Sequence, residues 1–213
     1  MRLLITSILF VFLNSCGTTQ RDGWQLASEF HSNYANEFIQ NTELLKYSYG
    51  PRMQFYYNPI HDKQTFRCWY HNSKLSVFNF GGFNIFQEEF QLKLDTLFAF
   101  KNIEFYHNQS ELRLMVNDSI QVKIISFSSD PINYFEQLRE QINEYGIVTY
   151  GKLRIGGIVE VYLTAYDYLL YFPTNLKIDE PQFEEHWRNK QKQGKQLDSN
   201  WFYYRSNKPL DFG

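Results

Sequence analysis

Cysteine is scarce in this sequence of 213 residues, where it occurs only at positions 16 and 68. If Cys16 is chemically modified, Cys68 has no partner in the chain, and a framework of internal disulfides is excluded. No Cys-x-x-Cys pair and no His-Glu-x-x-His pattern is present, so the sequence contains no recognisable set of zinc ligands. We therefore expect neither a metal nor another cofactor, and we expect side-chain packing to provide the stability.

An excess of charge of one sign is also missing. The chain has 21 basic and 23 acidic residues and a formal net charge of −2. Arg2 is the only charged residue among the first fifteen, so the rest of the chain has a net charge of −3. This balance predicts no strong field to steer nucleic acid or an anionic membrane surface to the protein. We expect no nucleic-acid partner.

Long hydrophobic runs are missing except at the amino terminus. Residues 3–13 form an apolar stretch without charge, directly after Met1 and Arg2. A membrane-spanning helix needs about 20 apolar residues, so this stretch is too short to cross a bilayer. A positive start, a short apolar segment and small residues at its end are the layout of a secretory signal.

The signal ends in Leu13-Asn14-Ser15-Cys16-Gly17. This segment resembles the lipobox of bacterial lipoproteins, with Leu three residues before the cysteine, a small Ser before it and Gly after it. Asn14 is a less usual residue for the middle position. The resemblance covers only these residues and implies cleavage before Cys16, a diacylglyceryl group on its sulfur and an acylated amine. The alternatives are an ordinary cleaved signal or an uncleaved apolar strand of the domain.

Gly17, the residue after the cysteine, bears on which membrane holds the protein. Lipoproteins without an acidic residue after the cysteine are usually sent to the outer membrane, so the resemblance favours that membrane over the inner one. We divide the chain into a signal peptide at 1–15, a tether at 16–23 and a single domain at 24–213.

The domain is rich in aromatic residues, which make up 19% of the chain and favour a core rich in β-sheet. Hairpin-like runs without regular strand–helix–strand alternation predict an α+β fold, with a mainly antiparallel sheet. An amino-terminal helix at about 24–46 and two further helices, starting at Asp130-Pro131 and at 179, are expected to pack on it. Residues 84–100 fit either helix or strand, and we favour strand in their second half. We expect strands at 53–57, 64–71, 75–80, 103–107, 111–116, 119–127, 147–150, 153–155, 158–164, 168–172 and 201–204.

Candidate catalytic residues are few. Cys68 and His71 lie three residues apart in a predicted strand and would point to opposite faces. Phe66 and Tyr70 flank Cys68 on its own face, which predicts that the thiol is buried in the core. His61 lies in a predicted turn beside Asp62, where an aspartate caps the local backbone. We predict no catalytic residue.

Tyrosines suggest a possible binding surface. Tyr166 and Tyr168 would share one strand face, and with Tyr171 they could form a surface for a sugar or an extended peptide. Tyr162 belongs to the same cluster. The alternative is a half-buried sheet with tyrosine hydroxyls at its edge.

Three hypotheses for the function follow. The first is a non-enzymatic interaction or structural module in the cell envelope, anchored to a membrane through lipid on Cys16, with an envelope protein or a glycan as a possible partner. The second is a lipoprotein that binds carbohydrate or peptide on its Tyr- and Trp-rich face. The third is a hydrolase with a site around Cys68 or His61.

Overall fold

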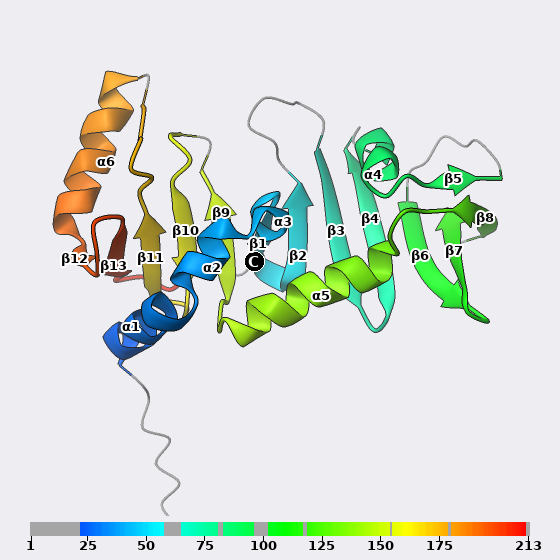
Figure 1. The fold of residues 1–213 in the computed structure, drawn as a ribbon, viewed down its shortest axis with the longest axis horizontal. Coiled ribbons are helices and arrows are strands. Elements are labelled where there is room, and N and C mark those ends of the chain that lie inside the picture. The colour runs from blue at the N-terminus through cyan, green and yellow to red at the C-terminus, as the bar shows by residue number, and fades with distance from the viewer. Residues whose placement is uncertain are drawn as a thin grey trace, which may run out of the picture.

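An antiparallel sheet of thirteen strands runs through the molecule (Figure 1). The computed structural model describes residues 22–57, 65–80, 83–95, 102–116, 119–153, 155–178 and 180–211. The strand order is β12-β13-β11-β10-β9-β1-β2-β3-β4-β6-β7-β8-β5, and each neighbouring pair is antiparallel. The chain is therefore a mixed helix and strand protein with a large antiparallel sheet, as its sequence predicts.

The strands follow the predicted positions closely in the middle of the chain. Their bounds are β1 (Tyr47–Gly50), β2 (Gln54–Tyr57), β3 (Thr65–His71), β4 (Lys74–Phe80), β5 (Lys93–Leu94), β6 (Asn102–Asn108), β7 (Glu111–Val116), β8 (Ile120–Ser126), β9 (Thr149–Lys152), β10 (Val159–Tyr162), β11 (Asp167–Tyr171), β12 (Lys195–Gln196) and β13 (Trp201–Arg205). The short strand expected at 153–155 is not seen at Leu153 or Ile155, and residue 154 lies outside the described residues. Residues 155–157 form a turn in which Gly156 and Gly157 have positive φ angles of 65° and 70°, a conformation that glycine adopts without steric cost.

The amino-terminal helix expected over 24–46 is instead three helices, α1 (Gly23–Asn33), α2 (Ala35–Gln40) and α3 (Thr42–Leu45). Tyr34 separates the first two because its φ of −128° is not helical. Asn41 separates the second pair, and its side-chain oxygen accepts a hydrogen bond from the backbone N–H of Leu44 at 3.1 Å. Asparagine favours this capping role over a place inside a helix.

Two further helices lie where the sequence predicts them. In α5 (Pro131–Glu144) the Asp130 carboxylate accepts hydrogen bonds from the first turn, and Gly146 follows the helix with a φ of 67°. The polar helix α6 (Pro181–Gln193) has no fully buried residue. A further helix, α4 (Phe83–Glu89), occupies the first half of the region 84–100, for which the sequence left helix and strand open. The strand favoured for the second half is present as β5, and residues 96–100 lie outside the described residues.

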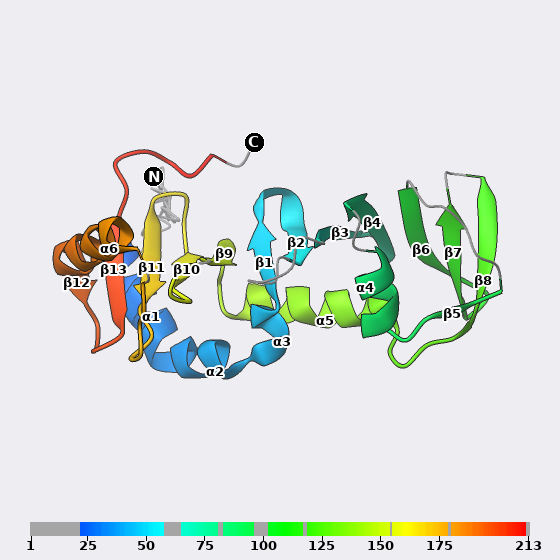
Figure 2. The ribbon, with the colours of Figure 1, turned by 90° about the horizontal axis from the view of Figure 1, so that it is seen from above.

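The helices lie on two sides of the sheet (Figure 2). Buried residues of α1 to α5 share one core with the sheet, and we call this side the helix side. Helix α6 lies on the other side, where Trp187 packs on the second cluster formed by β10, β11 and β13. Among the described residues, no helix has the length and apolar character needed to cross a membrane.

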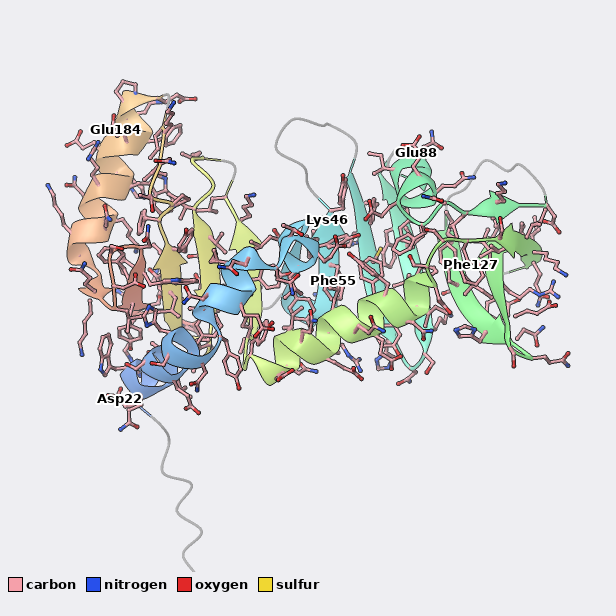
Figure 3. The ribbon with its side chains drawn as sticks, viewed as in Figure 1. Asp22, Lys46, Phe55, Glu88, Phe127 and Glu184 are labelled. Atoms are coloured by element: carbon pink, nitrogen blue, oxygen red, sulfur yellow. The ribbon has the colours of Figure 1, made fainter. Side chains whose placement is uncertain are left out.

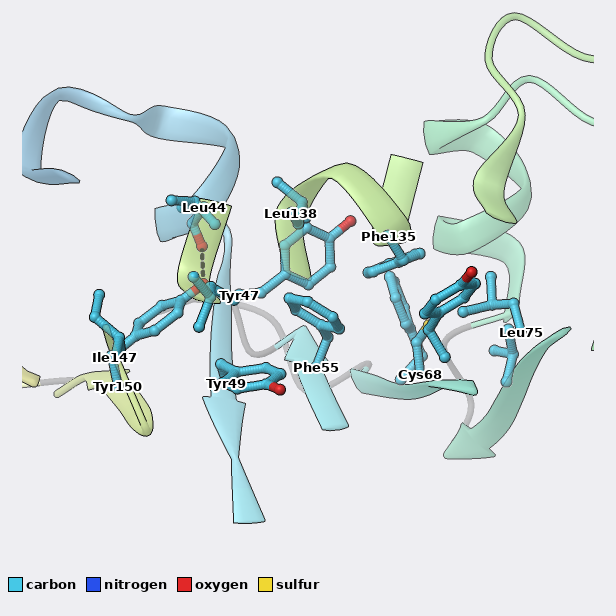
Figure 4. Packing of buried hydrophobic residues seen from close by; sticks show 14 of the residues in the cluster. Leu44, Tyr47, Tyr49, Phe55, Cys68, Leu75, Phe135, Leu138, Ile147 and Tyr150 are labelled. Carbon is cyan, nitrogen blue, oxygen red and sulfur yellow. Dashed lines mark hydrogen bonds between the residues drawn. The ribbon is translucent and has the colours of Figure 1, made fainter. Parts of the chain in front are cut away.

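Aromatic rings fill the core on the helix side (Figure 4). Phe55 of β2 packs against Phe135 of α5, with 5.1 Å between ring centroids. Tyr150 is buried, and its hydroxyl donates a hydrogen bond to the carbonyl of Leu44 at 2.8 Å. This bond satisfies the hydroxyl and ties β9 to α3.

Candidate functional site: the open face of the sheet

The sheet has a large face that no described helix covers. From β2 to β8, alternate residues are buried against the helix side, and the residues between them point the other way. Helix α6 lies on that other side but sits over β10, β11 and β13 (Figure 2). We call the uncovered part the open face and define it by Tyr56, Arg67, Trp69, His71, Lys74, Phe78, Glu104, Tyr106, Glu111, Arg113, Met115 and Lys123.

Trp69 lies on β3, the second strand of the open face, and is 37% exposed. Its ring stacks on the exposed His71 ring of the same strand, with 5.6 Å between centroids and an angle of 13° between planes. The residues opposite Trp69 on the adjacent strands are Gln54 and Ser76, which are much smaller. The indole is therefore presented to solvent by its surroundings, and an exposed ring of this kind is typical of a contact surface.

Arg67 is the next open-face residue of β3. It lies opposite Tyr56 on β2 and opposite Phe78 on β4. The guanidinium carbon lies 4.8 Å from the centroid of the Phe78 ring and 5.9 Å from that of the Tyr56 ring. Two cation–π contacts therefore hold this positive charge in place at the surface of the sheet.

Five other charged residues of the open face form ion pairs. Lys74 contacts Glu104 at 2.6 Å, and Glu111 contacts Arg113 at 2.7 Å and Lys123 at 3.7 Å. The open face therefore has a net charge of +2, from the four cations Arg67, Lys74, Arg113 and Lys123 and the two carboxylates of Glu104 and Glu111. Its acidic groups are each neutralised by a neighbouring cation.

The helix side has the opposite charge. Helices α1 to α5 together contain eight glutamates and one arginine, a net charge of −7. Figure 3 labels one of these acids, Glu88 of α4. By contrast, α6, which lies on the same side as the open face, contains three basic and two acidic residues. The total charge of the chain is thus close to zero although the two sides of the sheet have opposite charge, negative on the helix side and positive on the open side.

The structure does not bring the three predicted tyrosines together. Tyr166 is 40% exposed and lies in the bend between β10 and β11, outside either strand. Tyr168 is buried on the side that α6 covers, whereas Tyr171 packs against Trp201 on the helix side, with 5.2 Å between ring centroids. Residues 168 and 171 are three apart in one strand, so they must point to opposite faces.

A different row of tyrosines forms beneath α6. The Tyr168 ring stacks between those of Tyr162 and Tyr204, at centroid distances of 5.0 and 5.2 Å. Lys190 of α6 donates a hydrogen bond to the Tyr168 hydroxyl at 2.7 Å, and its ammonium lies 4.8 Å from the centre of the Tyr204 ring. Burial raises the pKa of Tyr162 and of Tyr204. The helix covers this row, which therefore packs α6 onto the sheet.

The candidate catalytic residues are separated or lie outside the described ranges. Cys68 is fully buried, and burial raises the pKa of its thiol well above the usual value. This surrounding disfavours the thiolate that a nucleophile needs. His71 points to the open face, on the opposite side of β3, as the spacing predicts. His61 and Cys16 lie outside the described residues.

The domain begins beside a buried carboxylate. Asp167 is 4% exposed and accepts hydrogen bonds from the hydroxyls of Tyr203 and Thr164, at 2.6 and 2.7 Å. Arg205 contacts the same carboxylate at 3.4 Å. Asp22, the residue before α1, lines the same hollow as Asp167 and Arg205. The entry point of the chain is therefore fixed at the end of β11 and β13.

In the ranges that the structure describes, no three His, Cys, Asp or Glu side chains are grouped to hold a metal ion. No protein-family model, no curated protein and no solved structure matches this chain.

Proposed function

We propose that this chain is a bacterial envelope lipoprotein, held on a membrane by lipid on Cys16, whose folded domain acts by binding. The observation that carries the proposal is the sequence Leu13-Asn14-Ser15-Cys16-Gly17, placed at the end of a signal-like segment. Two or more acyl chains on one residue hold a protein firmly on a bilayer, whereas a single chain binds reversibly. Gly17 favours the outer membrane as the location.

The distance between the cysteine and the folded domain fits a short tether. Asp22, the residue that caps the start of α1, follows Cys16 by six residues. Six residues span at most about 20 Å when fully extended. A lipid on Cys16 would therefore keep the domain next to the membrane surface.

The open face is the binding surface that we assign to the domain. Arginine, methionine and aromatic residues are enriched at protein interfaces, and tryptophan and arginine are frequent among the residues that contribute most to binding. Trp69, Arg67 and Met115 place these residue types on one uncovered surface. The burial of Cys68 argues against the hydrolase that would use this thiol.

Metabolic labelling with palmitate, combined with membrane fractionation, tests the anchor. We expect the chain to take up label and to stay with membranes after a high-salt wash. The matched variant Cys16→Ser should take up no label. A cleaved but unlabelled chain that leaves the membranes in the wash would show an ordinary secretory signal and would overturn the proposal.

A further inference from the structure

We propose that the open face docks on the anionic phospholipid surface of the same membrane that holds the lipid of Cys16. This inference rests on the proposed function, because the anchor is what brings the domain to a bilayer. The partner of the open face is therefore a lipid surface with headgroup phosphates.

Charge complementarity selects this face. Each cation near an anionic leaflet strengthens binding by a factor of about five. The open face has a net charge of +2, whereas α1 to α5 on the helix side have −7. An anionic surface therefore attracts one side of the sheet and repels the other, so the domain is turned with its helices away from the bilayer.

The side chains of the open face suit the boundary between headgroups and water. Tryptophan and tyrosine concentrate at this depth because each has an apolar ring and a polar group. Trp69, which is 37% exposed, supplies such a ring. The side chains of Lys74 and Lys123 contact Glu104 and Glu111 but are about half exposed, so their ammonium groups can also contact phosphates.

The tether permits this orientation. It enters the domain at Asp22, on the helix side but at the end of the sheet. At this end the sheet and then α6 lie between Asp22 and a bilayer on the open side, which is two layer spacings of about 10 Å each. Six extended residues reach about 20 Å, so the fully extended tether spans this distance. The anchor also makes docking intramolecular, with an effective concentration in the millimolar range. A weak electrostatic contact is then sufficient.

Vesicles that contain the full lipidated chain provide the test. The chain is reconstituted into phosphatidylcholine alone or into phosphatidylcholine with phosphatidylglycerol, with brominated lipid present in both. The signal of Trp69 is the difference in fluorescence quenching between the chain and its Trp69→Phe variant, which removes the contribution of the other three tryptophans. We expect this difference only in vesicles with phosphatidylglycerol, and we expect salt to reduce it.

Two variants of equal net charge separate docking from general electrostatics. Lys74→Gln with Lys123→Gln removes two cations from the open face, and the ratio of docked to undocked domain should fall about 25-fold. Asn133→Glu with Gln137→Glu adds two acids to exposed positions of α5 on the helix side and should leave docking unchanged or stronger.

The outcomes distinguish this inference from the anchor. A chain that does not remain with the vesicles contradicts the lipid on Cys16. A chain that remains, but shows equal Trp69 quenching with and without phosphatidylglycerol, overturns the docking alone. Protection of Trp69 by an added acidic glycan or a second protein, without quenching by lipid, would assign the open face to that partner and would also overturn the inference.

Discussion

The carboxylate of Asp167 occupies the space that a side chain on Gly23 would need. A Cβ atom added to Gly23 would overlap the carboxyl group of Asp167, which is held in place by Tyr203 and Thr164. The first position of α1 therefore requires glycine because a buried carboxylate lies close to its Cα atom. The backbone angles of Gly23 are not the reason, because its φ is not positive.

Gly23→Ala should destabilise the domain, although alanine favours a helix more than glycine does. Displacing the carboxylate would leave the part-buried hydroxyls of Tyr203 and Thr164 without an acceptor, and we expect a loss of about 2 kcal/mol in the free energy of unfolding. Urea denaturation measures this loss. Ser32→Ala, at an exposed position of the same helix, should change the stability by less than about 0.5 kcal/mol. Equal stability of Gly23→Ala and the unaltered chain would contradict the close approach.

Trp187 should hold α6 on the sheet. The helix has no fully buried residue, and the Trp187 ring contacts that of Phe172 at 6.3 Å between centroids. Trp187→Ala should lower the free energy of local opening by about 2 kcal/mol, without unfolding the rest of the sheet. Limited proteolysis should then cut within 181–193 much faster. Phe183→Ala, which removes an exposed ring, is the control, and equal cleavage of both variants would contradict the role of Trp187.

Glu160 should make the stability depend on pH. Burial raises the pKa of its carboxyl group, and the hydrogen bond from Tyr162 and the charge of Lys190 offset only part of this effect. A raised pKa in the folded state means that the protonated form is favoured by folding. The contribution to stability is thus complete below about pH 4.5 and is lost as the pH rises through the folded pKa.

Glu160→Gln should remove this loss, because an amide does not ionise. We expect the variant to gain stability relative to the unaltered chain at pH 7 and to gain less at pH 4. Urea denaturation at the two pH values measures the difference. Glu185→Gln, at an exposed position of α6, is the control. A variant that is less stable at pH 7 than at pH 4, relative to the unaltered chain, would contradict the sign.

Cys68 should resist alkylation in the folded protein. Its side chain is fully buried and its thiol is kept protonated by burial, so the reactive thiolate is absent. Mass spectrometry after treatment with N-ethylmaleimide should show an adduct on Cys68 in urea but not in native buffer. Rapid reaction in native buffer would reopen the possibility of a thiol enzyme.

The sequence predicts much of the fold where the signal is local. The start of α5 at Asp130-Pro131 depends on neighbouring residues and is confirmed. The strand expected at 111–116 is also confirmed, with the bounds of β7. The prediction of one continuous helix over 24–46 was wrong. The apolar spacing of the sequence continues through Tyr34 and Asn41, although the helix is interrupted at both residues.

The candidate site was harder to predict because it depends on pairing between distant strands. Tyr204 joins Tyr168 only through the pairing of β11 with β13, which no local pattern indicates. The open face has the same origin, since Arg67 and Phe78 meet across β3 and β4. From the total charge of −2, the sequence predicted no attraction of the protein to an anionic membrane surface. The separation of acidic helices from a basic sheet face is visible only in the folded structure.

Mass spectrometry of the chain purified from native membranes is the most direct test of the proposed anchor. The account predicts that the first peptide begins at Cys16 and has a diacylglyceryl group in thioether linkage to the cysteine sulfur. A first peptide that begins at Met1, or a Cys16 with an unmodified thiol, would contradict it.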